Sequence, residues 1–328
     1  MMKILILVAF LAVYSNAELC RDNSKNCDFW KKTLNFCSRS DAYDFCKKTC
    51  GGCTGVLTTK TPKKTTTTIS TKKAATDLPP LPGSCGISTV QQSRIIHGVD
   101  AKPGAWPWII SLQKFLQHQC GGTLLTPKWI LTASHCVHNY TTRNKGFWSV
   151  KVGAHNIAKN EATAKRKSIK RVIMHPDYHK RSLKADIALI ELNVPTQFNS
   201  RVSVACLPPR DVDPPIGKEC YLSGWGSIKH PGGWHHTLQQ TRLPIVPSME
   251  CKKPDVVCVG NGFKNQPDGR QQPNACRGDS GGPLVCQQSD GRWQLEGVAS
   301  YVYTYCKYYT AYTPVNKFMN WINSYIRN

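Results

Sequence analysis

The sequence is short of acidic residues. Its 328 residues include 43 Lys and Arg but 20 Asp and Glu, so the formal net charge at pH 7 is +23. Residues 95–328 hold 29 Lys and Arg against 14 Asp and Glu, so the excess is not confined to one tail. Such a positive field attracts acidic glycans or anionic cell surfaces, or serves solubility alone. No basic stretch alternates with aromatic residues at a nucleic-acid-binding spacing, so nucleic acid is not an expected partner.

Long apolar runs are absent after the first residues. A membrane-spanning helix needs roughly 20 apolar residues, and no stretch after Val13 supplies them. The one apolar run, Ile4–Val13, follows Lys3 and precedes Ser15-Asn16-Ala17. A basic start, a short apolar core and small residues before a cleavage point are typical of a secretory signal peptide. We expect cleavage after Ala17 (signal peptide 1–17) and a soluble, secreted, extracellular mature protein without a membrane span.

Cysteine is absent from residues 54–84 and abundant on both sides. Of the 16 cysteines, six lie between Cys20 and Cys53 and ten lie between Cys85 and Cys306. An even number of cysteines in an exported chain indicates disulfides rather than a metal site or redox chemistry. The gap is rich in Thr, Lys and Pro, with too few apolar residues to form a core. We predict that residues 54–84 are an extended linker.

From Arg94 onward, short apolar runs alternate with Gly, Pro and other turn residues. The clearest runs are residues 108–112, 123–125, 129–132, 150–152, 187–192 and 295–300. This pattern predicts an all-β region of about 230 residues, built as one large unit or as two fused barrels. Near the C-terminus, apolar residues recur at three- and four-residue spacing from Val315 to Ile326, which predicts a helix with one buried face.

The first six cysteines follow a recognisable spacing. Residues 20–53 are too few to form a core without disulfides. Their ending, CKKTCGGC at 46–53, resembles the ShK toxin (ShKT) domain of sea anemone peptides. Spacing alone leaves the disulfide connectivity open. The resemblance implies an ShKT domain at 20–53 with the pairs Cys20–Cys53, Cys27–Cys46 and Cys37–Cys50.

Channel-blocking members of the ShKT family carry a lysine directly before a tyrosine. Here Ala42 precedes Tyr43, so the lysine that closes the channel pore is missing. We expect the module to act as a binding or targeting accessory or as a structural cap. A toxin or binding protein that acts on an ion channel through this module is the alternative function.

Three separated segments contain the residue types of nucleophilic serine catalysis. They are LTASHC at 131–136, ADIAL at 185–189 and GDSGGP at 278–283. A serine hydroxyl needs a base to remove its proton, and the base needs an acid to hold its tautomer. The chain order His, Asp, Ser is that of chymotrypsin-type enzymes. From Arg94 to the C-terminus, the chain resembles the trypsin-like (chymotrypsin-fold) serine proteases.

This resemblance implies an all-β fold of two packed antiparallel six-stranded β-barrels with a C-terminal helix, preceded by the small disulfide-rich ShKT module. It assigns Ser280 as the nucleophile, His135 as the general base and then acid, and Asp186 as the buried orienting carboxylate. The backbone N–H groups of Gly278 and Ser280 form the oxyanion hole. Ser300 hydrogen-bonds Asp186. The expected activity is that of a serine endopeptidase, a hydrolase without a cofactor.

Residues 94–98, RIIHG, resemble the junction at which members of this family are activated. Cleavage after Arg94 frees the amine of Ile95, which pairs with Asp279 and orders the oxyanion hole. The resemblance thus implies a zymogen with an activation segment at 85–94 and a trypsin-like protease domain at 95–328.

All ten remaining cysteines find partners through the same resemblance. The implied pairs are Cys85–Cys206, Cys120–Cys136, Cys220–Cys286, Cys251–Cys258 and Cys276–Cys306. The first pair crosses the activation site, so the N-terminal module is expected to stay attached after cleavage.

The residue six positions before the nucleophile, at the floor of the family's primary specificity pocket, is Asn274. Trypsins carry an acid there, so cleavage after Lys or Arg is not expected, and activation at Arg94 requires a separate trypsin-like protease. By alignment, Ser300, Val302 and Thr310 also line the pocket, the last two where glycines are usual. Elastases carry similar residues and prefer small aliphatic side chains. A chymotrypsin-like preference for larger apolar residues is the alternative.

Three other motifs have simpler interpretations. The tripeptide RGD at 277–279 spells an adhesion motif, but its Gly and Asp supply an oxyanion donor and the activation carboxylate in a protease. Asn139-Tyr140-Thr141 is a glycosylation sequon, which fits a secreted glycoprotein. The stretch that matches the family's calcium loop, residues 153–156, has Ala154 where the first glutamate is usual, so no metal is expected.

Overall fold

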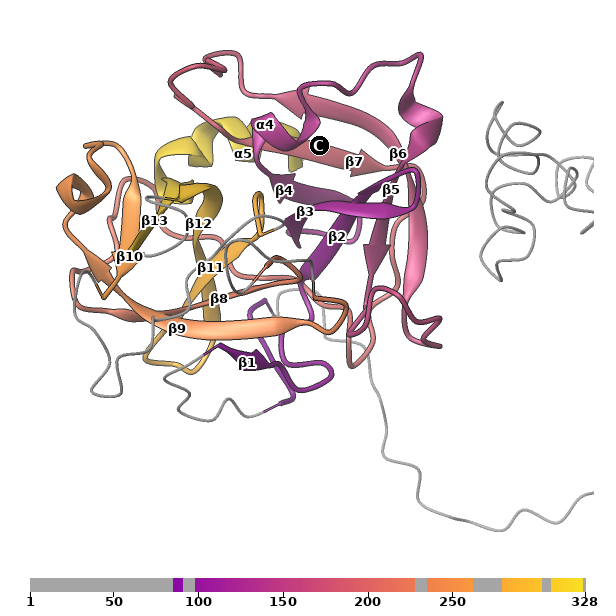
Figure 1. The fold of residues 1–328 in the computed structure, drawn as a ribbon, viewed down its shortest axis with the longest axis horizontal. Helices are drawn as coiled ribbons and strands as arrows, with labels where there is room; N and C mark the ends of the chain where they lie inside the picture. Colours follow the sequence, from indigo (N-terminus) through magenta and orange to yellow (C-terminus); the bar gives the residue numbers. More distant parts are fainter. Residues whose placement is uncertain (1–84, 91–97, 228–234, 262–278, 303–307, 327–328) are drawn as a thin grey trace, which may run out of the picture. The chain divides into compact units, whose positions relative to one another are not determined.

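A computed structural model describes residues 85–90, 98–227, 235–261, 279–302 and 308–326 (Figure 1). These residues belong to one compact unit of the chain, Asp77–Asn328. The predicted signal peptide, ShKT domain and linker lie outside the described residues. So do four predicted site residues, namely Arg94, Ile95, Asn274 and Gly278.

The first half of the described chain forms a closed barrel of six strands (Figure 1). The strands are β2 (Ile109–Lys114), β3 (Gln117–Leu124), β4 (Trp129–Thr132), β5 (Trp148–Val152), β6 (Lys165–Met174) and β7 (Ala188–Leu192). Around the barrel they follow the order β2-β3-β4-β7-β6-β5, and every pairing is antiparallel. The helix α4 (Ser134–Val137) follows β4, and the 3-10 helix η2 (Lys145–Phe147) precedes β5.

The second half forms another six-stranded ring. Its strands are β8 (Glu219–Gly224), β9 (Gln239–Val246), β10 (Val257–Gly260), β11 (Pro283–Gln287), β12 (Trp293–Val302) and β13 (Tyr309–Pro314). Their order is β9-β10-β13-β12-β11-β8, and the additional β9–β8 pairing closes the ring. The short β1 (Val99–Asp100) adds to β9, and the 3-10 helix η3 (Ser248–Cys251) follows it. The predicted fold of two antiparallel six-stranded barrels is confirmed.

Trp106, just before β2, joins the two barrels. Its ring packs against Tyr221 of β8 and Trp293 of β12, with ring centroids 5.3 and 4.9 Å apart. Its indole N–H donates to the side-chain oxygen of Gln240 on β9 at 2.8 Å. A buried tryptophan contributes a large apolar surface and needs a partner for its N–H, and both requirements are met here. The contact fixes the first barrel against the second, which is necessary for any site that draws on both.

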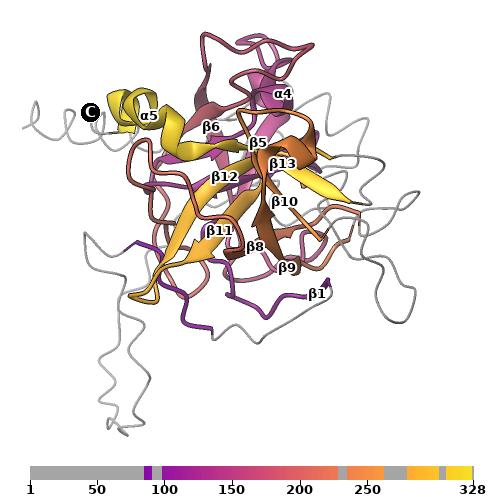
Figure 2. The ribbon, with the colours of Figure 1, turned by 90° about the vertical axis from the view of Figure 1, so that its left-hand side faces the viewer.

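The predicted C-terminal helix is confirmed. The 3-10 helix η4 (Val315–Phe318) continues into α5 (Met319–Ile326), which is labelled in Figure 2. Val315, Met319 and Ile322 are buried. The ring of Tyr325 lies 6.3 Å from that of Trp129, so the helix packs on the start of β4. Within the described ranges, no helix has the length and apolar character to cross a membrane.

Four disulfides lie within the described ranges. They are Cys85–Cys206, Cys120–Cys136, Cys220–Cys286 and Cys251–Cys258, each matching a pair implied by the family resemblance. Cys276–Cys306 and the three pairs of the ShKT segment fall outside the described residues. The Cys220–Cys286 bond joins neighbouring strands, because these residues face each other in the β8–β11 register.

Candidate active site

His135 lies in the first turn of α4, directly after the end of β4. Its Nδ1 lies 2.6 Å from Oδ2 of Asp186, and its backbone N–H donates to Oδ1 of the same carboxylate at 2.8 Å. The two contacts hold both the ring and the backbone of His135 against one side chain. With the proton on Nδ1, the Nε2 atom is free to accept a proton from a nucleophile.

Asp186 is completely buried, just before β7. Oδ2 also accepts a hydrogen bond from Ser300 Oγ at 2.6 Å, and the backbone carbonyl of Asp186 accepts one from Thr313 Oγ1 at 3.1 Å. Ser134 Oγ donates to the carbonyl of Ile187 at 2.6 Å. A buried carboxylate needs donors to offset its desolvation, and here His135 of the first barrel and Ser300 of the second supply them.

The turn that carries Ser280 packs against β3 and β4, close to α4, which carries His135. Gly121 of β3 donates its N–H to the carbonyl of Ser280 at 2.8 Å. Gly281 has a φ of +76°, and a Cβ there would lie 2.3 Å from Thr132 Oγ1 at the end of β4. Only glycine allows both this backbone conformation and this close approach. The turn therefore brings the half-buried Ser280 of the second barrel to the His135 end of the first.

The Asp279 side chain lies toward the β8–β9 side of the second barrel. Its Oδ1 accepts the backbone N–H of Gly226 at 3.0 Å, and Gly224 leaves room for it because a Cβ there would lie 1.9 Å from the same oxygen. Burial and the negative charge of Asp279 raise the pKa of Tyr312 well above its usual range. A cavity of about 20 Å³ beside Asp279 is lined in part by Gly98, three residues after Ile95.

Two of the predicted pocket residues form a cross-strand pair. Val302 of β12 and Thr310 of β13 face each other in the register, Val302 being partly buried and Thr310 buried. Directly opposed side chains have Cβ atoms roughly 5 Å apart, so the two lie together on one face of the sheet. Ser300, two residues before Val302, is buried and bonded to Asp186. The fourth predicted pocket residue, Asn274, lies outside the described residues.

Lys253, which belongs to none of the predicted motifs, contacts the loop before Asp186. Its Nζ donates to the backbone carbonyls of Ser182 at 2.8 Å and Leu183 at 3.1 Å, and it lies 5.7 Å from the ring centre of Tyr301. Burial lowers the pKa of Lys253, while the charges of Asp186 and Asp255 oppose that effect. The lysine thus ties the loop before Asp186 to the strand after Ser300. No sequence signal marks it, because its partners are about 70 residues away.

The loop preceding Asp186 is held in an uncommon conformation. Leu183 and Ala185 have φ values of +51° and +47°, in the left-handed region that non-glycine residues seldom adopt. Backbone conformations of this kind persist only where the surroundings hold them, and they cluster at functional sites. The Lys253 contacts with the carbonyls of Ser182 and Leu183 are one such restraint.

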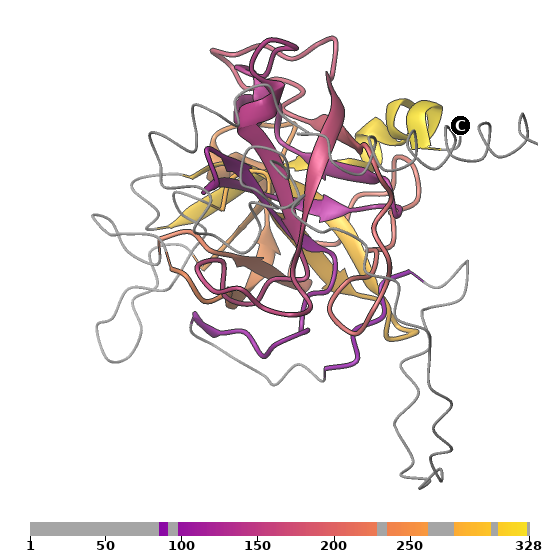
Figure 3. The same ribbon diagram turned by 90° about the vertical axis from the view of Figure 1, so that its right-hand side faces the viewer.

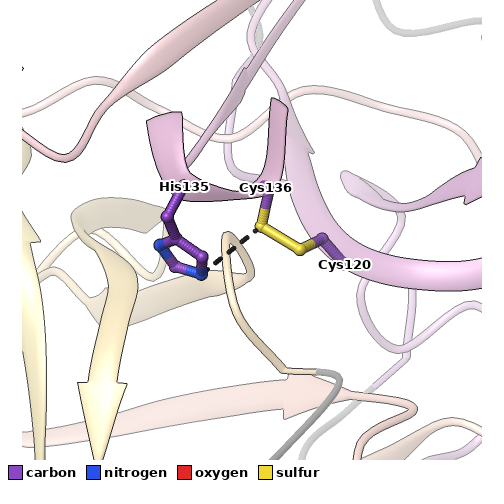
Figure 4. Close-up of side chains that lie close together, drawn as sticks. All are labelled: Cys120, His135 and Cys136. Atoms are coloured by element: carbon purple, nitrogen blue, oxygen red, sulfur yellow. Dashed lines mark hydrogen bonds between the residues drawn. A yellow bond between two sulfur atoms is a disulfide. The ribbon is translucent and has the colours of Figure 1, made fainter. Parts of the chain in front are cut away.

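Cys120, His135 and Cys136 form the one compact group of potential metal ligands in the described part of the chain (Figure 4). The two sulfurs are bonded to each other, and His135 Nε2 lies 3.7 Å from Cys136 Sγ. Metal sites use cysteine as the free thiolate, so this group does not suit a metal. Its disulfide instead anchors α4 to β3.

The backbone of the stretch at 153–156 is hydrogen-bonded to the carboxylate of Glu161. Glu161 Oε2 accepts the backbone N–H groups of His155 at 2.6 Å and Asn156 at 3.1 Å, and its Oε1 lies 3.3 Å from Arg201. Burial lowers the pKa of His155, with Glu161 opposing the effect. At the predicted sequon, the exposed Asn139 accepts a hydrogen bond at its carbonyl from Asn144.

Known proteins resemble this chain over the two barrels. The profile of the Trypsin family matches residues 95–322. The human protein "Chymotrypsin-like elastase family member 3A" is 35% identical over 260 residues, which cover 73% of this chain and 91% of the relative. The solved structure of human heparin binding protein aligns with a TM-score of 0.62 at 26% identity, over 71% of this chain and 97% of that chain. A mutant of the same human protein aligns with a TM-score of 0.63 at the same identity and coverage.

The family profile spans both barrels, and the elastase relative is matched over most of its length. Both findings agree with the two-barrel fold and with the histidine, aspartate and serine segments that it draws together. The chain therefore belongs to the trypsin family of serine proteases and is a serine endopeptidase.

Proposed function

We propose that the protein is a secreted, zymogen-type endopeptidase that cuts peptide bonds through an acyl-enzyme, with His135, Asp186 and Ser280 as its triad. The observation that carries the proposal is the buried Asp186 carboxylate, which holds His135 Nδ1 and Ser300 Oγ at 2.6 Å each. This arrangement orients the ring and stabilises the imidazolium that forms when His135 takes up a proton.

The proposed reaction has two halves. His135 Nε2 takes the proton of Ser280 Oγ as this oxygen attacks the scissile carbonyl, and the N–H groups of Gly278 and Ser280 stabilise the negative oxygen. The C–N bond then breaks, and His135 donates its proton to the leaving amine. Water, deprotonated by His135, attacks the acyl-enzyme and releases the acid while Ser280 regains its proton.

Activation is proposed to follow cleavage after Arg94, at the boundary of the proposed 85–94 and 95–328 segments. The new amine of Ile95 would pair with the carboxylate of Asp279. The small cavity beside Asp279, lined in part by Gly98, supports this proposal because the chain enters it three residues after Ile95. The Cys85–Cys206 disulfide keeps the segment before the cleavage site attached to the protease domain.

The proposed specificity is elastase-like, for small aliphatic residues. Val302 and Thr310 form a cross-strand pair where glycines would leave a wider opening, and Asn274 brings no charge to attract Lys or Arg. The 35% identity to an elastase family member supports the same preference. The second candidate is a chymotrypsin-like preference for larger apolar residues. Either preference requires a separate trypsin-like protease to activate the zymogen at Arg94.

The parts before the protease domain are proposed as accessories. The signal peptide at 1–17 directs export, the ShKT domain at 20–53 binds or targets, and the linker at 54–84 separates it from the enzyme. Acidic glycans are the proposed partner of the positive charge, and likeness to a protein named for heparin binding supports this choice. An ion channel bound through the ShKT domain is the alternative partner. Asn139 is the proposed glycosylation site.

A library of peptides tests the enzymatic proposal. The purified chain is treated with trypsin, the trypsin is inhibited, and cleavage is compared with that of a Ser280→Ala variant treated identically. We expect cleavage after small aliphatic residues, and a loss of about a millionfold in kcat for the variant. Cleavage mainly after Lys or Arg would contradict the pocket assignment. Zymogen that converts itself at Arg94 without added protease would contradict both the pocket and the separate activator.

A further inference from the structure

Positive charge is concentrated in the first barrel. Between Ile109 and Met174 the sequence contains eleven Lys and Arg, and Glu161 is its sole acidic residue. From His175 to the C-terminus, by contrast, 17 Lys and Arg are accompanied by 12 Asp and Glu. Strand β6, Lys165–Met174, carries five of the basic residues and no acid. The first barrel therefore supplies most of the excess charge of the protease region.

Three of these cations converge on one buried carboxylate. Lys128 and Lys170 each place Nζ 3.0 Å from Oε1 of Glu191, and Arg171 Nε lies 2.5 Å from Oε2. The Glu191 side chain is 4% exposed, whereas those of the three cations are 39%, 51% and 53% exposed. One carboxylate neutralises one of the three charges. It thus orders three outward-facing cations and leaves a net positive charge on the surface.

The strand registers place a further cation, Lys114, in line with the cations around Glu191. Glu191 of β7 faces Trp129 of β4 on one side and Arg171 of β6 on the other. On β5, Ser149 faces Ser168 of β6. The preceding residue, Trp148, therefore lies beside the part of β6 just before Lys170. Trp148 in turn faces Lys114 of β2.

Lys114, Lys128, Lys170 and Arg171 thus follow one line over five neighbouring strands, which we call the basic row. At a strand spacing of about 4.8 Å the row is roughly 19 Å long. It lies on the first barrel, whose strands are drawn in purple to pink in Figure 3. Thr132 and Ala188, the residues of β4 and β7 nearest His135 and Asp186, face each other at the other end of these strands.

Two buried tryptophans underlie the row. The Arg171 guanidinium lies 5.5 Å from the ring centre of Trp129, and Lys114 Nζ lies 5.3 Å from that of Trp148. Both tryptophans are 5% exposed. Such contacts hold long cationic side chains in place, so less conformational entropy is lost when an anion binds. Because both rings are buried, neither can stack on a base, which disfavours binding of single-stranded nucleic acid.

We propose that the basic row binds a sulfated polysaccharide chain. This proposal rests on the acidic-glycan partner proposed above and assigns it to the protease domain rather than to the N-terminal segments. A sulfated glycan is a linear polyanion, and it can follow ordered cations along a line on a convex barrel. A flat anionic membrane would meet fewer of them at once. Because Lys128, Lys170 and Arg171 lie at the ends of their strands away from His135, glycan bound to these three cations would leave the catalytic residues accessible.

The test compares two variants with equal losses of charge. Lys170→Gln/Arg171→Gln removes half of the row but leaves Lys128 with Glu191. Lys180→Gln/Arg181→Gln removes an equally adjacent, exposed Lys–Arg pair outside the row. Both are made in the full chain with Ser280→Ala to prevent proteolysis. Their affinity for a heparin oligosaccharide is measured at physiological ionic strength, together with a thermal melt to check folding.

We expect the Lys170/Arg171 variant to bind heparin about tenfold more weakly, and the Lys180/Arg181 variant to change less than twofold. Equal weakening in both folded variants would mean that net charge alone binds the glycan, and it would overturn the proposal. So would tighter binding through the row to duplex DNA of matched charge, or to phosphatidylserine vesicles, than to heparin. If the Lys170/Arg171 variant melts well below the parent, Lys114→Gln repeats the test without disturbing Glu191.

Peptide hydrolysis separates this proposal from the enzymatic one. Trypsin-activated protein with Lys170→Gln/Arg171→Gln and an intact Ser280 should keep the parental kcat/KM on a short peptide. Loss of heparin binding with unchanged hydrolysis supports the basic row. Absence of hydrolysis in the parent would contradict the proposed enzyme and leave the heparin comparison intact.

Discussion

At the scale of single residues, Asp186 is where the polar contacts of the active site meet. Its carboxylate accepts the backbone N–H of His135 and lies 2.6 Å from both the ring Nδ1 and Ser300 Oγ. Because the group is fully buried, each donor offsets part of the cost of desolvating it. The donors come from α4 and β12, so the two barrels must be assembled before the histidine is oriented.

Replacing Ser300 with Ala should lower kcat/KM about tenfold, since one hydrogen bond to a charged group is lost. Asp186→Asn should lower kcat by about 10⁴, because the ring is then held in the wrong tautomer. Thr313→Val is the matched control. Its hydroxyl bonds the backbone carbonyl of Asp186 rather than the carboxylate, so it should change the melting temperature more than kcat/KM. Equal kinetic effects of the Ser300 and Thr313 variants would contradict this assignment.

Lys253 is expected to affect catalysis indirectly, by restraining the loop before Asp186. Lys253→Met removes the donor to the Ser182 and Leu183 carbonyls and the cation beside Tyr301. We expect kcat/KM on a peptide substrate to fall about tenfold, because the loop that leads into Asp186 loses two hydrogen bonds that hold it. Steady-state kinetics measures this, with the exposed Lys180→Met as control and a thermal melt to check folding. An equal loss in the Lys180 variant would contradict a specific effect of the Lys253 contacts.

At the scale of elements, the Ser280 turn depends on its fit against β3 and β4. Gly281 and Gly291 both have positive φ, +76° and +82°. A Cβ at Gly281 would meet Thr132 Oγ1 at 2.3 Å, whereas a Cβ at Gly291 would meet nothing within 4 Å. Alanine at Gly291 would therefore cause backbone strain alone, whereas alanine at Gly281 would cause backbone strain and a steric clash.

Gly291→Ala should cost about 1 kcal/mol of unfolding free energy from backbone strain alone, with activity retained. Gly281→Ala should be more destabilising and should lower kcat/KM at least a hundredfold, because the Ser280 turn must move away from Thr132. Thermal melts and peptide hydrolysis of the activated variants measure both effects. Gly281→Ala with parental activity would contradict the proposed role of the turn.

Strands β4, β6 and β7 are joined through Glu191, and this contact depends on pH. Burial alone would raise the pKa of Glu191, but hydrogen bonds from Lys170, Lys128 and Arg171 overcome it and lower the pKa from 4.5 to about 2. A carboxyl whose pKa is lower in the folded state stabilises the fold above its unfolded pKa. That contribution is lost as the pH falls from about 4.5 toward 2.

Glu191→Gln should therefore destabilise the protein most above pH 5, and the difference from the parent should shrink toward pH 2. Urea unfolding of the Ser280→Ala background at a series of pH values measures this difference. A gap between parent and variant that stays constant from pH 6 to pH 2.5 would show that Glu191 does not titrate as described.

At the scale of the whole molecule, the Cys85–Cys206 disulfide joins the two segments that cleavage after Arg94 would separate. Cys85 is bonded to Cys206, and the adjacent Gly86 donates its N–H to the carbonyl of Val204 and accepts the N–H of Trp293, both at 2.8 Å. Residues 85–90 are therefore docked on the protease domain on the N-terminal side of the proposed cleavage point. The N-terminal segments would remain part of the active enzyme and could direct where it acts.

With the linker residues Lys60, Lys63, Lys64, Lys72 and Lys73 changed to Gln, so that trypsin does not cut the linker, trypsin-treated protein should run as one band on a denaturing gel without reductant and as two bands after reduction. Cys85→Ser/Cys206→Ser should release the N-terminal fragment in both conditions while keeping hydrolysis of a short peptide. Two bands from the parent without reductant would mean that cleavage occurs elsewhere than at Arg94, or that the disulfide does not hold the fragment.

Much of the fold and the core of the site could be predicted from the sequence. Predicted apolar runs lie on β2, β3, β4, β5, β7 and β12, and the C-terminal helix begins at the predicted Val315. These features depend on the spacing of apolar residues along the chain, which can be read from the sequence. The family membership follows from three short motifs in a fixed order.

Other features depended on the tertiary structure. Lys253 and its carbonyl partners, Thr313 below Asp186, and the cations around Glu191 come from segments 20 to 127 residues apart. Strand register and barrel closure decide which of these side chains meet, and a register shift by one residue would turn each to the opposite face. The fold class, the family and the available chemistry follow from the amino-acid sequence alone. How the loop before Asp186 is restrained, and where cations are held in place on the surface, depends on the closure of the barrels.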